Sequence, residues 1–120
     1  MSETSFAHLF APIAVVGMEV VVFAFLDSHG RLLGMRHIPS ARFASVNVPI
    51  RLVATDALAF DARAVVMAHN HPSGDPEPST QDLRVTRGIA TAFDALGIRL
   101  IDHLVLAGDV VTSFRGRGLL

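Results

Sequence analysis

Cysteine and lysine are both absent from this chain of 120 residues. Without cysteine, the protein forms neither a disulfide bond nor a zinc site with thiolate ligands. The lack of disulfides is compatible with a reducing compartment, and we expect a cytoplasmic protein. All ten basic residues are arginine, and eleven acidic residues bring the formal net charge to −1. This balance lacks the basic excess of a dedicated nucleic-acid binder. A solvated surface is the simpler explanation than a local basic patch for Arg84, Arg87, Arg115 and Arg117.

One apolar stretch, residues 9–26, raises the question of a membrane or signal segment. Residues 1–4 carry no positive charge, which a signal peptide requires. Pro12 and Gly17 interrupt the run, and Glu19 would cost about 2.5–3.5 kcal/mol at the centre of a membrane helix. The consecutive valines 20–22 are typical of a buried strand. We therefore expect no membrane association.

No repeat, low-complexity tract or long linker divides the chain, so we expect a single domain over residues 1–120. Residues 40–48 fit either an irregular loop or a short strand. Elsewhere the apolar periodicity predicts, in order, strands at 19–27 and from 31 onward, a helix at 49–60, a strand at 63–68, a helix from Ser79 to Gly97, and strands at 98–107 and 110–114. This order predicts an α/β fold with a single mixed β-sheet flanked by two helices.

Two histidines follow the strand predicted at 63–68, within the segment HNHPSGDPEPSTQD that runs from His69 to Asp82. Alternate residues of a strand point to the same face, so the side chains of His69 and His71 project together. Imidazole nitrogen and carboxylate oxygen are zinc ligands, and Asp82 is placed to supply a third donor. Three protein ligands leave a fourth position for water, as in a catalytic zinc site. The pattern favours metal binding over a structural role.

Ser79 and Asp82 have a second explanation, because Ser-x-x-Asp at a helix start is close to a capping box. The positive end of the helix dipole favours Asp82 at this position and keeps it ionised, as a metal ligand must be. The spacing explains Ser79 equally well as a helix cap and as a hydrogen-bond donor in catalysis.

Two further positions are ambiguous. Glu19 opens an otherwise apolar strand, either as an ordinary residue at its exposed start or as a general base beside the metal. Asp102 and His103 lie in the strand predicted at 98–107, where a structural role, or a supporting role behind the metal ligands, is the simplest explanation. Asp102 is nevertheless a candidate partner for the second nitrogen of a metal-bound imidazole.

Two other metal-dependent classes fit less well. His69-Asn70-His71 spells the HNH label of a nuclease motif, but three adjacent residues are weak evidence for a motif that spans a longer unit. A zinc nucleoside deaminase requires His-x-Glu and a later Pro-Cys-x-x-Cys, and this chain has no cysteine.

The segment from His69 to Asp82 resembles the metal-binding signature of the JAB/MPN/JAMM metalloprotease superfamily. That signature is an upstream Glu, then His-x-His, ten residues and Asp, with Ser three residues before the Asp. The resemblance is closest to the RadC-like branch, in which HNHPSGDP followed by Pro-Ser is typical. EVVVFAFLDSHGRLL, IRLIDHLVLAGD and SFRGRGLL extend it over about residues 18–120.

The resemblance implies a JAB/MPN fold, which is similar to that of cytidine deaminases, and zinc held by His69, His71, Asp82 and a water. It implies Glu19 as general base and Ser79 as the hydroxyl that steadies the oxyanion. Members of the superfamily cleave peptide or isopeptide bonds, so a protein or peptide substrate is expected. The alternative is a non-hydrolytic module of DNA repair or recombination, with nucleic acid as partner; a homodimer is left open.

Two regions depart from the RadC-like pattern. Residues 1–17 form only a short N-terminal extension, without the helix-hairpin-helix region usual in that branch, which weakens a DNA-binding role. Residues 38–48 match the branch poorly, which bears on the substrate and not on the five site positions.

Overall fold

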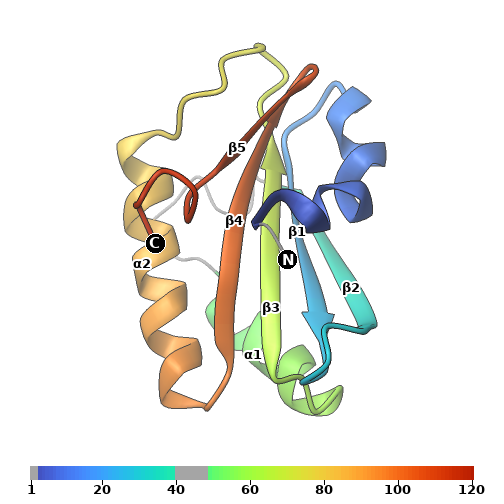
Figure 1. Ribbon diagram of the computed structural model, residues 1–120, viewed down its shortest axis with the longest axis vertical. Coiled ribbons are helices and arrows are strands. Elements are labelled where there is room, and N and C mark those ends of the chain that lie inside the picture. The colour runs from blue at the N-terminus through green and yellow to red at the C-terminus, as the bar shows by residue number, and fades with distance from the viewer. Residues whose placement is uncertain (1–2, 40–48) are drawn as a thin grey trace.

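The protein is described by a computed structural model that covers residues 3–39 and 49–120 (Figure 1). Its elements are η1 (Glu3–Val15), β1 (Val20–Leu26), β2 (Leu32–Pro39), α1 (Ile50–Ala59), β3 (Ala64–Asn70), α2 (Thr80–Ala95), β4 (Arg99–Ala107) and β5 (Val110–Ser113). The strands form one sheet in the order β2-β1-β3-β4-β5. Only the β3–β4 pair is parallel among these strands, so the sheet is mixed. The predicted α/β class and order of strands and α-helices are confirmed, while residues 40–48 lie outside the described ranges.

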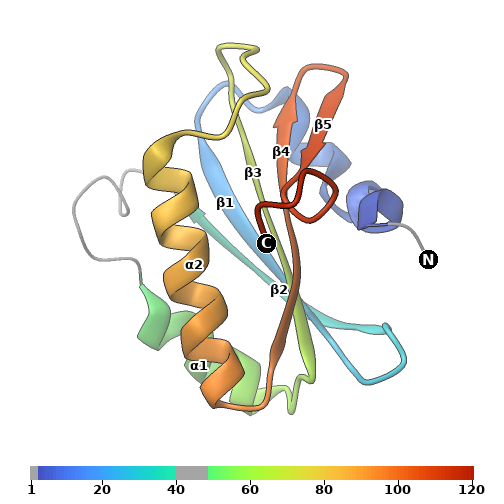
Figure 2. The ribbon, with the colours of Figure 1, turned by 60° about the vertical axis from the view of Figure 1, so that its left-hand side comes forward.

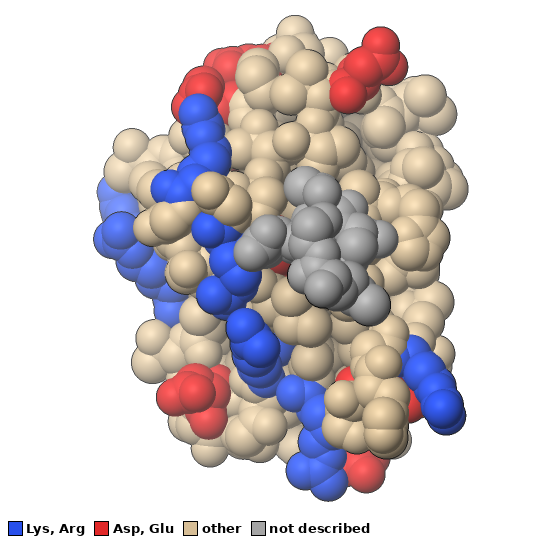
Figure 3. Space-filling view, in the orientation of Figure 1, with Lys and Arg blue, Asp and Glu red and all other residues tan. Residues whose placement is uncertain are grey.

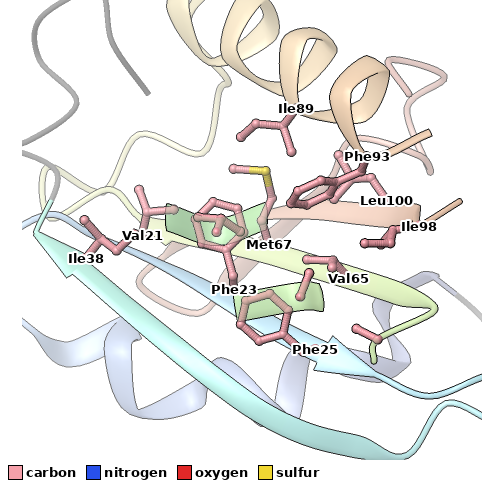
Figure 4. Close-up of a cluster of buried hydrophobic side chains, with 13 residues drawn as sticks. Val21, Phe23, Phe25, Ile38, Val65, Met67, Ile89, Phe93, Ile98 and Leu100 are labelled. Atoms are coloured by element: carbon pink, nitrogen blue, oxygen red, sulfur yellow. The ribbon is translucent and has the colours of Figure 1, made fainter. Parts of the chain in front are cut away.

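The two faces of the sheet are covered by different helices (Figure 2). Because successive strand residues point to opposite faces, each central strand supplies both cores. On the first face, Phe23 and Met67 pack against Ile89 and Phe93 of α2 and Val53 of α1 (Figure 4). We call this the helix-side face. On the second face, the alternate residues of β1, β3 and β4 pack against η1; we call this the η1-side face.

The 3₁₀ helix η1 was not expected. Phe10 and Ile13 are 1% and 5% exposed and pack on the η1-side face. Residues three apart eclipse in a 3₁₀ helix, so a period of 3.6 does not reveal it, and Pro12 breaks the pattern of an α-helix. Part of the segment treated as an N-terminal extension therefore contributes to the core.

The topology gathers three chain segments at one end of the sheet. β1 and β3 are antiparallel, with Val21 opposite His69, so the start of β1 lies beside the end of β3. The loop after β3 leads to the start of α2 at the same end, which is the upper end in Figure 1. Within the described ranges, no helix has the length and apolar character needed to span a bilayer.

Candidate metal centre

Three side chains from β3, the loop after it and α2 converge on one point. Nε2 of His69 lies 2.7 Å from Nε2 of His71. Oδ2 of Asp82 lies 3.4 Å from the first of these nitrogens and 3.5 Å from the second. His69 is 2% exposed, whereas His71 and Asp82 are partly buried. The structure thus brings together the three residues that the sequence analysis suggested as metal ligands.

The spacing of these atoms fits a divalent ion. Donor atoms about 2.0–2.1 Å from zinc in a tetrahedral arrangement lie roughly 3.3 Å apart. Both distances to Asp82, 3.4 and 3.5 Å, agree with this value. The 2.7 Å between the two imidazole nitrogens is shorter, so the rings would separate slightly around an ion.

The backbone fixes which nitrogen of His71 is available. Nδ1 of His71 lies 2.7 Å from the carbonyl oxygen of Asp75, which only accepts hydrogen bonds. Nδ1 therefore carries the proton and donates it to Asp75. In the neutral ring, Nε2 is left with its lone pair directed toward His69 and Asp82.

A buried relay fixes the tautomer of His69 in the same way. The hydroxyl of Thr86 donates to the carbonyl oxygen of Asp82 at 2.6 Å, so its oxygen must accept from Nδ1 of His103, also at 2.6 Å. Burial lowers the pKa of His103 well below its ordinary value and keeps the ring neutral. Nε2 of His103 then accepts from Nδ1 of His69 at 2.6 Å. The lone pair of His69 is consequently on Nε2, which faces the site.

The structural interpretation of Asp102 is confirmed, and the alternative that it is the partner of a metal-bound imidazole is wrong, because His103 takes that place. The carboxylate of Asp102 is fully buried and accepts hydrogen bonds from the backbone N–H of His103, the hydroxyl of Ser113 and the backbone N–H of Arg115. Asp102 therefore holds the end of β5 and the segment after it onto β4. The ring of His103 stacks on Phe114 with centroids 4.4 Å apart, which leaves its nitrogens in contact with Thr86 and His69.

Asp82 is oriented by the helix start that it helps to form. Ser79 Oγ accepts from the backbone N–H of Asp82 at 3.0 Å, and Oδ2 of Asp82 accepts from the backbone N–H of Ser79 at 2.8 Å. The capping box is therefore present. Burial opposes ionisation of this carboxyl, but two contacts outweigh it: the hydrogen bond and charge of His69, when its Nε2 carries a second proton in place of a metal ion, and the backbone N–H of Ser79. They hold the pKa of Asp82 well below its ordinary value. Asp82 is ionised at neutral pH, as a ligand requires.

Glu19 stands immediately before β1, exposed, at the edge of the same site. Its carboxylate oxygen and the ring nitrogens of His69 and His71 lie within 4.8 Å of one another. A pocket of about 330 Å³ opens here, lined by these three side chains together with Ser79, Asp82, Gln81 and His103, and by the apolar Val21, Met67 and Val85. The pocket thus joins a cluster of acceptors and a carboxylate to an apolar wall that suits a substrate side chain.

The specific contacts of three residues around the site were not predicted from the sequence. Thr86 lies one helical turn after Asp82, a spacing that places both on one face of α2 and offered a usable signal. His103 lies opposite Met67 in the parallel pairing of β3 with β4, and no signal short of that register identifies it. Asn70 lies between the two histidines but points to the η1-side face, where it contacts the segment that carries Glu19.

A family profile and several curated proteins match this chain over most of its length. The profile of the RadC-like JAB domain matches residues 2–119. A UPF0758 protein of Cupriavidus pinatubonensis is 40% identical over 114 residues, which are 95% of this chain and 50% of that protein. A UPF0758 protein of Vibrio cholerae is 37% identical over 119 residues, 99% of this chain and 75% of that protein. One of Cellvibrio japonicus is 41% identical over 102 residues, 85% of this chain and 46% of that protein. The chain thus spans about half the length of two of these relatives.

Proposed function

Because the chain belongs to the RadC-like JAB domain family, we propose that it is a zinc-dependent hydrolase that cleaves a peptide or isopeptide bond. The observation that carries the proposal is the convergence of three acceptors, Nε2 of His69, Nε2 of His71 and Oδ2 of Asp82, at 2.7, 3.4 and 3.5 Å. Lone pairs at these distances repel one another unless a cation, either a proton or a metal ion, lies between them. The donor set, two neutral imidazoles and one carboxylate, is that of a catalytic zinc site.

Five polar side chains of the pocket have a place in this reaction. His69, His71 and Asp82 would hold the ion, and zinc bound there supplies the Lewis acidity that polarises a carbonyl group and activates water near neutral pH. Glu19 accepts the proton of the attacking water and passes it to the leaving nitrogen. The oxygen of Ser79 is occupied by the N–H of Asp82, so its proton is available to the developing oxyanion. Capping and catalysis by Ser79 are therefore compatible.

Replacement of the base tests the proposal. Glu19→Gln removes the proton acceptor and keeps the size of the side chain, so we expect about a 10²- to 10⁴-fold loss of rate with zinc binding retained. Turnover is measured on an unbiased peptide library and zinc binding by competition with a chromophoric chelator. Glu77→Gln is the matched control, since Glu77 is exposed and pairs with Arg117 outside the pocket. An unchanged rate in Glu19→Gln refutes the role of Glu19.

A second candidate function, docking of nucleic acid without hydrolysis, is favoured by one observation. On the face drawn in Figure 3, the basic side chains, all arginine in this chain, form an oblique band, and the acidic side chains lie mainly around its margins. Such a band suits a phosphate backbone. Affinity for DNA that falls steeply with salt, in a protein that cleaves no peptide, would favour this function. Equal affinity for DNA at low and high salt would not.

We propose that the protein is located in the cytoplasm. The chain has no cysteine and so forms no disulfide bond that would require an oxidising compartment. Cell fractionation followed by detection of the protein in the soluble or the membrane fraction tests this assignment.

A further inference from the structure

Asn70 lies between the two histidines in sequence but on the other face of the sheet. Its neighbours His69 and His71 point into the pocket, while its own amide points toward η1 and the start of β1. The residue is 1% exposed. A buried amide is costly unless its donors and acceptors are paired, so its partners reveal what it does.

All three hydrogen bonds of this amide go to one short segment. Its Oδ1 accepts from the backbone N–H of Val20 at 2.7 Å. Its Nδ2 donates to the carbonyl oxygens of Val16 and Met18, both at 3.0 Å. Both protons of the amide are used, and only this orientation of the group matches two acceptors and one donor. Two of these partners, Met18 and Val20, are the residues on either side of Glu19.

This segment needs such a support because regular structure is interrupted there. η1 ends at Val15 and β1 begins at Val20. The ladder between β1 and β3 ends where Val21 lies opposite His69. Beyond that pair, the side chain of Asn70 takes the place of backbone pairing and continues the connection toward Glu19.

We propose that Asn70 is a positioning residue that holds the carboxylate of Glu19 at the metal centre. Asn70 is the residue between His69 and His71 in the chain, so the position of Glu19 is set by a residue covalently joined to two of the candidate metal ligands. The inference rests on the proposed function for its catalytic meaning. The placement of Glu19 by Asn70 can also be tested without any substrate.

Asn70→Asp is the sharpest variant. It keeps the shape of the side chain and an acceptor for Val20, but it replaces the donor to Val16 and Met18 by an oxygen that their carbonyl oxygens repel. We expect kcat to fall about 10- to 100-fold, the loss typical of a misplaced catalytic group, while zinc affinity stays within a few-fold of the wild type. Asn70→Ser, which is smaller and uncharged, should act in the same direction.

A double-mutant cycle separates positioning from general damage. In a Glu19→Gln background, Asn70→Asp should cause no further loss of kcat, because Asn70 acts through Glu19. Losses that multiply would show that Asn70 acts through the fold or the metal ligands and would overturn the inference. A Glu19→Gln variant with full activity would instead refute the role of Glu19 in catalysis. A zinc-loaded wild type that cleaves no peptide would refute the proposed function, whatever Asn70 does.

A measurement on Glu19 itself needs no turnover. The chain has three glutamates, so selective ¹³C labelling of their carboxyl groups gives three resonances, assigned with Glu19→Gln and Glu77→Gln. On addition of Zn²⁺, the Glu19 resonance should shift in the wild type and remain in place in Asn70→Asp and Asn70→Ser. Protected amides in β4 would verify that each variant is folded. The same zinc-dependent shift in a folded variant as in the wild type would contradict the inference.

Discussion

The two faces of the sheet are built from the same strands and serve different purposes. On the helix-side face, the alternate residues of β3 run from Val65 through Met67 to His69, so an apolar core ends in a candidate metal ligand. On the η1-side face, the residues between them run from Val66 through Ala68 to Asn70, so the core ends in an amide bonded to backbone. The helix-side face therefore ends at the candidate metal centre, and the η1-side face ends at the amide that holds the segment carrying Glu19. The pleat of a strand allows both within three consecutive residues.

The largest effect is expected from removing an apolar anchor of the η1-side face. Phe10→Ala leaves a cavity where a fully buried ring packed, and we expect the free energy of unfolding to fall by about 3–5 kcal/mol. Zinc affinity of the folded protein should remain unchanged, because the ligands lie on the other face. Chemical denaturation and chelator competition measure the two quantities. Phe60→Ala, at a residue that is 41% exposed, is the control and should cost clearly less.

A smaller effect is expected from breaking the relay behind His69. Thr86→Val keeps the shape of the side chain but removes the hydroxyl that accepts from His103 and donates to the carbonyl of Asp82. Loss of such a contact behind a ligand typically lowers metal affinity about 10- to 100-fold. Thr86→Ser retains the hydroxyl and should bind zinc nearly as the wild type does. Equal zinc affinity in Thr86→Val and the wild type would show that the relay does not orient His69.

The smallest effect is expected at an ion pair on the helix-side face but away from the site. Arg36 donates two hydrogen bonds to Asp56, at 2.6 and 2.9 Å, and these lower the pKa of Asp56 from its ordinary value of 3.8. Because the folded-state pKa is lowered, the pair stabilises the fold above pH 3.8 and this contribution disappears as the pH falls through the lowered value.

Asp56→Asn should therefore cost less than about 1 kcal/mol at neutral pH, since Arg36 is partly exposed. Urea denaturation of both proteins at pH 7 and at pH 3 measures the difference, which should shrink at the lower pH. A difference that grows on acidification would contradict the assignment. The kcat and KM of the proposed hydrolysis should not change, because the ion pair lies away from the pocket.

The strands, the two α-helices and the side chains that meet at the candidate metal centre could be predicted from the sequence, because each depends on a local pattern. Val65, Met67 and His69 share a face by alternation alone, and Ser79 with Asp82 is a local helix-start pattern. Both remain valid in the structure because no long-range packing overrides them. The roles of Glu19 and Ser79 in catalysis stay predictions.

The partner of His69 could not be predicted, because it depends on one irregularity in the sheet. The pairing of β3 with β4 shifts register between Val65 and Val66, so that Val66 lies opposite Asp102 and Met67 opposite His103. Without the shift, Asp102 would lie opposite Met67 and face the site. A single extra residue in β4 therefore decides which of two adjacent polar side chains contacts His69. The hydrogen bond between Asn70 and Val20 likewise joins residues 50 positions apart in the chain, so no local pattern reveals it.

Metal content tests the central claim most directly. Protein purified without chelators and analysed by mass spectrometry for metals should contain about one zinc ion per chain, or take up one when Zn²⁺ is added. His69→Ala should contain none, while His37→Ala, at an exposed histidine of β2, should match the wild type. A wild-type protein that neither contains zinc nor binds it on addition would contradict the account.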